Sequence, residues 1–234
     1  MARLRRKDLK RDRFVEEVTH QVTFVAAHRK QFIAGGLAIV IVLVASVGYW
    51  SYARQRNQAS RAALQEAVES YHGIVGEESV PGAKKFSSEA ERLDSVTAAL
   101  DKVTLDYSGT AAAAGALYYA GLLDREEDNT AEARSHFEQA TRGKGTEYPS
   151  LARLALAELL FAEGEVAGAR EQLQSLVENP TRTISRDRAS IELARTYLET
   201  DPQKAREMLD AIQAENGPAS PLAAALLETL SEGI

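Results

Sequence analysis

The fold is decided by the stretch Ala131-Glu-Ala-Arg-Ser-His-Phe-Glu-Gln-Ala140, which the chain repeats. The pattern returns as Ala167-Gly-Ala-Arg-Glu-Gln-Leu-Gln-Ser-Leu176 and again as Gln203-Lys-Ala-Arg-Glu-Met-Leu-Asp-Ala-Ile212. The Ala-Arg pair and the two apolar positions that follow it each recur after 36 residues. A fixed period of about this length is typical of proteins built from stacked structural repeats.

A second apolar helix is predicted before each copy. These upstream segments are Leu117-Tyr-Tyr-Ala-Gly121, Leu156-Ala-Glu-Leu-Leu160 and Leu193-Ala-Arg-Thr-Tyr197. Each pairs a small residue with a small residue of the next helix: Gly121 with Ala133, Ala157 with Ala169, and Ala194 with Ala205. Small residues let two antiparallel helices approach closely while larger apolar side chains fill the space around the contact.

The region outside the three copies is also predicted to be helical. A helix is expected to continue out of the apolar run over residues 54–76, and a capping helix is expected from Pro221 to Leu230. Turn residues predict where two helices of the repeats begin: Asp128-Asn-Thr130 gives a cap before Ala131, and Asp201-Pro202 opens the helix of the third copy. An earlier helix is marked by Phe86, Leu93, Val96, Leu100 and Val103, after a loop at Val80-Pro-Gly82. Because no stretch shows the alternation of a strand, we predict an all-α body of about nine helices.

These helix pairs resemble tetratricopeptide repeats. The best match is the unit that contains Leu156, Ala157, Leu160, Gly164, Ala169 and Leu173, closed by Pro180. Asp124 departs from the pattern, since it stands where a large apolar residue is wanted. The resemblance implies an α-solenoid of antiparallel helix pairs over residues 54–234, in which the first helix of each pair lines the concave side.

The concave positions supply the candidate binding residues. They are Tyr118, Arg125, Leu154, Glu158, Phe161, Ile191, Arg195 and Leu198. The apolar members Leu154, Ile191 and Leu198 have the alternative of packing between neighbouring repeats. Aromatic and arginine side chains are typical anchors of protein interfaces. We therefore predict a protein-binding surface formed by Tyr118, Arg125, Glu158, Phe161 and Arg195.

A run of 23 residues without charge, from Gln31 to Ala53, predicts one membrane-spanning helix. At about 1.5 Å per residue it reaches roughly 34 Å, enough to cross a bilayer core. The predicted anchors at its two ends are Phe32, Trp50 and Tyr52. One alternative is a cleaved signal peptide, with small residues at Ser46-Val-Gly48, although the run exceeds the usual length of about 7–15 residues. The other is a helix buried in a soluble core.

The charges on the two sides of this run differ in sign. Residues 1–30 hold nine basic and four acidic side chains, a net charge of +5, whereas the remaining 19 basic and 30 acidic side chains give −11. A short basic tail stays in the cytoplasm, so we expect the acidic body on the other side of the membrane. Close to the run the basic residues are nearly even, with four before it and three after it.

The tail has an apolar face of its own. Phe14, Val18, Val22 and Val25 recur at helical spacing. This pattern predicts an amphipathic helix that lies on the inner leaflet or runs into the span, or else one that docks on a cytoplasmic partner.

The composition excludes several classes of protein. The chain has no cysteine, which rules out disulfides, thiolate metal sites and a cysteine nucleophile. An acidic body argues against nucleic acid as a partner. The four histidines are scattered, His136 is expected to face solvent, and Gly143-Lys-Gly-Thr146 lacks the frame of a phosphate loop. We predict no enzyme activity, no cofactor, no metal and no small-molecule substrate.

The whole layout is similar to a bacterial family, the ancillary subunit of the SecYEG translocon. The residue match is best where Gly48-Tyr-Trp-Ser-Tyr52 leads into Gln58-Ala-Ser-Arg-Ala-Ala-Leu-Gln-Glu-Ala67. The resemblance implies a single-pass protein of the inner membrane, with a cytoplasmic N-terminus and a periplasmic repeat domain that contacts the translocon and periplasmic chaperones. The alternative is a scaffold protein that forms homo-oligomers and organises another envelope complex.

Overall fold

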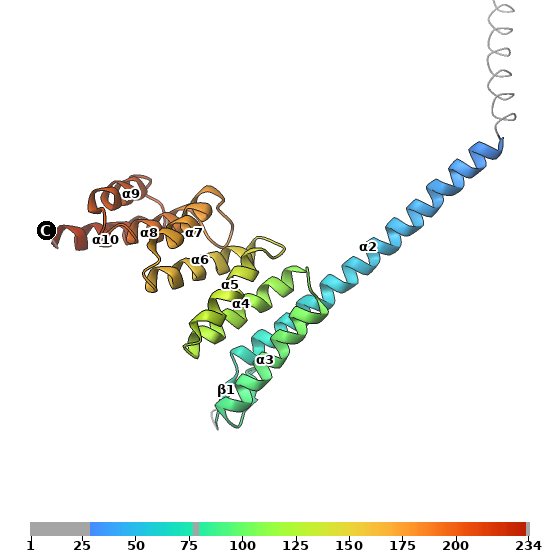
Figure 1. The fold of residues 1–234 in the computed structure, drawn as a ribbon, viewed down its shortest axis with the longest axis horizontal. Helices are drawn as coiled ribbons and strands as arrows, with labels where there is room; N and C mark the ends of the chain where they lie inside the picture. Colours follow the sequence, from blue (N-terminus) through green and yellow to red (C-terminus); the bar gives the residue numbers. More distant parts are fainter. Residues whose placement is uncertain (1–28, 77–79, 233–234) are drawn as a thin grey trace, which may run out of the picture. The chain divides into compact units, whose positions relative to one another are not determined.

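The computed structural model describes residues 29–76 and 80–232, in which it forms nine helices and two very short strands. The order is α2 (Arg29–Tyr71), β1 (Ile74–Val75), β2 (Lys85–Phe86), α3 (Glu89–Asp106), α4 (Ala111–Glu126), α5 (Thr130–Thr141), α6 (Glu147–Ala162), α7 (Val166–Glu178), α8 (Arg186–Arg195), α9 (Pro202–Ala214) and α10 (Ser220–Glu232) (Figure 1). The predicted all-α class, with a long apolar helix ahead of a helical repeat, is confirmed.

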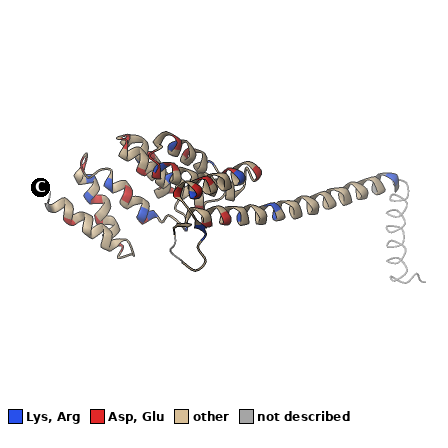
Figure 2. Ribbon diagram, turned by 90° about the horizontal axis from the view of Figure 1, so that it is seen from below, with Lys and Arg blue, Asp and Glu red and all other residues tan. Residues whose placement is uncertain are grey.

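The chain divides into two compact units, Met1–Gln55 and Arg56–Ile234, and α2 passes from one to the other. In the first unit α2 is long and apolar enough to cross a membrane. Its side chains from Ile33 onward are exposed, including Trp50 and Tyr52, and the Arg54 guanidinium lies 5.4 Å from the centre of the Trp50 ring. Figure 2 shows a long stretch of α2 without charged residues, which runs from Gln31 to Ala53 between the basic residues Lys30 and Arg54. The predicted amphipathic tail helix and the Phe32 side chain lie outside the described residues.

The second unit is a row of helices in which each helix from α3 to α10 packs against the next (Figure 1). Four apolar clusters follow one another along this row. The first joins α2, α3 and α4, the second α4 to α7, the third α6 to α8, and the last α8 to α10. Neighbouring clusters share a helix, so the unit has one continuous core, as expected of a solenoid.

Helices α4 and α5 approach closely at the predicted small-residue pair. Ala133 is fully buried, and a Cβ atom added to Gly121 would come within 2.6 Å of the Phe137 ring. Real side chains do not approach one another so closely, so only glycine allows the Phe137 ring to lie on α4. The corresponding pairs, Ala157 with Ala169 and Ala194 with Ala205, are also fully buried.

The predicted helix boundaries hold where a side chain caps the first turn. Asp201 accepts a hydrogen bond from the Lys204 backbone N–H, and Pro202 takes the first position of α9. Ser88, Thr110 and Ser185 cap α3, α4 and α8 in the same way. At α5 the Asn129 side chain forms no capping hydrogen bond, although the helix begins beside it as predicted.

Two predicted helices differ from the structure near the α2–α3 connection. Helix α2 ends at Tyr71, not at residue 76, and Phe86 lies in strand β2, not in α3. Ile74 and Val75 pair in parallel with Lys85 and Phe86. The Phe86 ring packs against Gly73, where a Cβ atom would lie 2.4 Å from it. This contact buries the Phe86 side chain in strand β2, outside helix α3.

Asp124 and His136 also correct the sequence analysis. Asp124 is a residue of helix α4, and its Oδ2 lies 2.6 Å from Nδ1 of His136 on α5. His136 is half-buried, so it does not simply face solvent. The pair explains the missing apolar residue in this repeat, since Asp124 fills its place by bonding to the neighbouring helix.

Arg170 joins the second and third copies of the repeat. Its guanidinium donates hydrogen bonds from α7 to the backbone carbonyl and hydroxyl of Thr196, and it stacks 3.7 Å from the centre of the Tyr197 ring. A planar guanidinium can make all these contacts together, whereas an ammonium group cannot.

Phe137→Ala is expected to lower the free energy of unfolding by about 3–5 kcal/mol, because it empties the contact between α4 and α5. Phe161→Ala is the matched control, since its ring is 44% exposed, and it should change that energy by less than about 0.5 kcal/mol. Urea unfolding of the full chain in detergent, followed by circular dichroism, measures both. Equal losses in the two variants would contradict the assigned packing.

Arg170→Lys is expected to cost about 1–2 kcal/mol, because lysine keeps the charge but loses the paired hydrogen bonds and the stacking. Arg182→Lys replaces an exposed arginine and should have almost no effect. The same urea titration compares the two variants. If Arg170→Lys lowers the free energy of unfolding no more than Arg182→Lys does, the contacts of Arg170 do not stabilise the domain.

Candidate functional site

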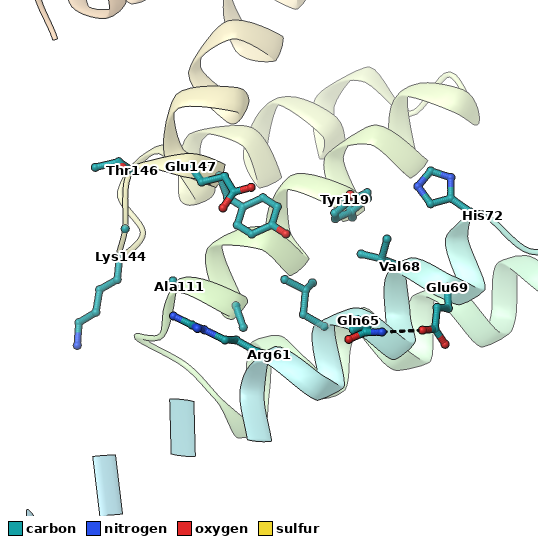
Figure 3. A pocket seen from close by; sticks show the side chains of 14 residues that line it. Arg61, Gln65, Val68, Glu69, His72, Ala111, Tyr119, Lys144, Thr146 and Glu147 are labelled. Atoms are coloured by element: carbon teal, nitrogen blue, oxygen red, sulfur yellow. Dashed lines mark hydrogen bonds between the residues drawn. The ribbon is translucent and has the colours of Figure 1, made fainter. Parts of the chain in front are cut away.

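A groove lies where the first helices of three pairs meet. Its volume is about 750 Å³, within the range of about 300–1,000 Å³ that is typical of ligand sites. Helix α2 contributes residues from Arg61 to Glu69, and His72 follows directly after its end. Helix α4 contributes Ala111, Ala112 and Tyr119, and the α5–α6 turn with the start of α6 contributes Lys144 to Tyr148. Figure 3 shows these side chains around the opening.

The α2 wall follows from helical spacing. Arg61, Gln65 and Val68 recur at intervals of three or four residues, which places them on one face of the helix, and His72 follows at the same spacing just after the helix ends. Leu64, on the neighbouring face, is buried against α3 and α4. One edge of α2 therefore builds the core, and the adjoining edge lines the groove.

Aromatic rings form the middle of the groove. The Tyr119 ring centre lies 6.2 Å from that of Tyr148 and 5.3 Å from that of Tyr71. His72 lies 6.4 Å from Tyr119, and Tyr118 lies 5.4 Å from it. All four tyrosines are half-buried, so their rings are held by packing while one edge remains open.

Burial changes the acidity of these phenols. It raises the pKa of Tyr71, and the hydrogen bond that its hydroxyl donates to Glu126 raises it further. Burial also raises the pKa of Tyr119 and Tyr148, with the negative charge of Glu147 as a smaller cause. The hydroxyls of Tyr119 and Tyr148 therefore stay protonated at neutral pH and can donate hydrogen bonds to a bound group, whereas the Tyr71 hydroxyl already donates to Glu126.

Three of the predicted binding residues lie together beside the groove. Arg125 of α4 donates a long hydrogen bond of 3.5 Å to Glu158 of α6, and about half of each side chain is exposed. Tyr118 lies close enough to both for their charges to act on its hydroxyl, and Arg188 of α8 acts on it as well. Tyr118, Arg125 and Glu158 thus form a polar patch across α4 and α6.

The other predicted residues lie apart from this patch. Phe161 is exposed near the end of α6, and Arg195 bonds to Glu192 on its own helix α8. Leu154 and Ile191 are buried, as expected for residues that pack between neighbouring repeats, and Leu198, which follows α8, is half-buried.

The sequence analysis missed most of the residues that line the groove. Tyr119 and Tyr148 supply its rings. Its charges come from Arg61, Glu69, Lys144 and Glu147. A partial signal was present in the Tyr-Tyr pair after Leu117 and in the tyrosine two positions after Thr146. Among the described residues there is no group of three or more residues that could hold a metal ion.

The comparisons agree with the repeat architecture. Residues 106–220 match the family described as the tetratricopeptide repeat-like domain, from the end of α3 to the first residue of α10. No curated protein and no solved structure matches the chain. Repeats of this kind are generally non-catalytic modules for protein interaction. The chain therefore contains a tetratricopeptide repeat-like domain at residues 106–220. A domain of this kind indicates a role in protein interaction.

Proposed function

We propose that this protein is a membrane-anchored, non-enzymatic module that binds protein segments in the groove between α2, α4 and α6. The observation that carries the proposal is the ring-lined groove, in which Tyr119 and Tyr148 are held by packing yet remain open on one edge. Rigid aromatic side chains give a large contact area at a low entropic cost, and they dominate the energy of many interfaces.

The neighbouring polar patch extends the proposed surface. Arg125 and Glu158 pair at 3.5 Å while remaining half exposed, so a partner could exchange one member of the pair for its own charged group. Exposed pairs of this kind contribute little to stability, about 0–1 kcal/mol, and breaking one costs little on binding. Tyr118 connects this patch to the rings of the groove.

We also propose the division of the chain that its charge pattern favours. Residues 1–30 form a basic cytoplasmic tail, residues 31–53 span the membrane, and residues 54–234 form the repeat domain outside it. The exposed apolar side chains of α2 support the span, because no described part of the protein covers them. The basic tail supports the orientation.

The proposed location is the inner membrane, with the groove in the periplasm, and the proposed partners are the Sec translocon and periplasmic chaperones. What supports this choice is the likeness of the segment that leaves the membrane, Gly48 to Tyr52 followed by Gln58 to Ala67, to the ancillary translocon subunits. The second of these segments includes Arg61, Leu64 and Gln65 of the groove.

A photo-crosslinking amino acid at position 119 tests the function in intact cells. The expected result is covalent adducts of Tyr119 variants with translocon subunits or periplasmic chaperones, identified by mass spectrometry. The matched control is position 105 on α3, where Leu105 is 77% exposed and outside the groove. Adducts that form equally from both positions, or from neither, would count against a binding groove, and adducts with a second copy of the chain would favour the scaffold alternative.

A reporter enzyme fused after residue 234 tests the orientation. A reporter that is active only in the periplasm should be active in this fusion, because the basic tail holds the N-terminus in the cytoplasm. A fusion at residue 30, before the span, is the control and should be inactive. The opposite pattern would overturn the proposed topology.

A further inference from the structure

We infer that the groove takes an extended protein segment carrying an acidic and a basic residue about four positions apart, with an apolar side chain between them. The inference rests on the proposed function, because it names the chemistry of the segment that the same groove would bind. It follows from the distribution of charge along the groove and from the spacing of the charges.

One end of the groove is positively charged. Figure 3 shows Arg61 of α2 and Lys144 of the α5–α6 turn at the same end, near Ala111. Both side chains are exposed, and within residues 29–76 and 80–232 neither takes part in a salt bridge. Two cations without a carboxylate partner can bind an acidic side chain of a ligand, and no existing salt bridge has to be broken.

The opposite end is negatively charged. Glu69 lies there beside His72, and the carboxylate accepts a hydrogen bond from Gln65 at 3.0 Å. This bond comes from a neutral amide, so the negative charge of Glu69 is not compensated. A basic side chain of a bound segment would find its partner at this end.

The middle of the groove is apolar and aromatic. Val68 and Ala112 line the groove together with the rings of Tyr119 and Tyr148. Glu147 lies beside Thr146, on the wall formed by the start of α6 and on the side of Lys144, and its charge acts on both tyrosines (Figure 3). An aliphatic or aromatic side chain fits this middle part, because it would bury apolar area against rings that are already in place.

The spacing of the charges points to an extended segment. Arg61 and Glu69 lie about two turns apart on α2, or about 12 Å along its axis. An extended chain covers this distance in about four residues, at about 3.3 Å each.

Three synthetic peptides test the inference by fluorescence anisotropy. All have blocked ends and the same apolar centre, flanked four positions apart by one acid and one base, by two acids, or by two bases. The full chain in a non-ionic detergent should bind the acid–base peptide roughly three- to tenfold more tightly than the other two. The preference should shrink at high salt, because it is electrostatic.

Charge reversal at each end makes the test specific. Glu69→Lys should turn the preference toward the two-acid peptide, and Arg61→Glu combined with Lys144→Glu should turn it toward the two-base peptide. These side chains are exposed, so the fold should be retained, which circular dichroism checks. Glu171→Lys, at an exposed position on α7 outside the groove, is the matched control and should keep the preference of the unaltered chain.

The outcomes separate this inference from the proposed function. A switch of preference in both directions supports the bipolar groove. An unchanged preference in the reversed variants, or no measurable binding of any peptide, overturns it. If crosslinks from position 119 still recover protein partners in that case, the groove binds protein but not by this charge pattern, and the proposed function stands. If those crosslinks are also absent, both fail.

Discussion

The close approach of α4 and α5 at Gly121 is the contact on which the rest of the repeat domain depends. Because position 121 has no side chain, the Phe137 ring can lie directly against α4 and be completely buried. The ring also lies 6.2 Å from that of Tyr118, so the same contact fixes the face that α4 turns toward α6. The packing of one glycine thereby fixes the rotation of α4 about its axis, and this rotation sets the direction of Tyr119.

The groove is a consequence of this packing and does not need a separate structural element. Tyr118 and Tyr119 are neighbours in the sequence, so on a helix they point about 100° apart. Tyr118 takes the side of α5 and α6, and Tyr119 is left on the side of α2. Helix α2 then closes the second wall with the face that carries Arg61 and Glu69. Stability and binding are therefore assigned to different faces of the same helices.

Most of the fold could be predicted from the sequence because it repeats. The period and the small-residue pairs indicated the helix pairs from α4 to α9, and Asp201 with Pro202 indicated where α9 begins. The site was harder to predict, because α2 lacks the repeat pattern, and only its packing against α3 and α4 shows which of its faces lines the groove. Phe86 was misassigned for a similar reason. Its spacing from Leu93 suggested a helix, but its position is set by packing against Gly73, which the helical pattern does not reveal.

The central claim is that the groove between α2, α4 and α6 is where a protein partner binds. An experimental structure of the full chain joined to a partner recovered from cells tests it most directly. The account predicts an extended partner segment in contact with Tyr119 and Tyr148, between the Arg61 and Glu69 ends. A complex in which this groove is empty and the partner lies on α3, α5 or α7 would contradict the account.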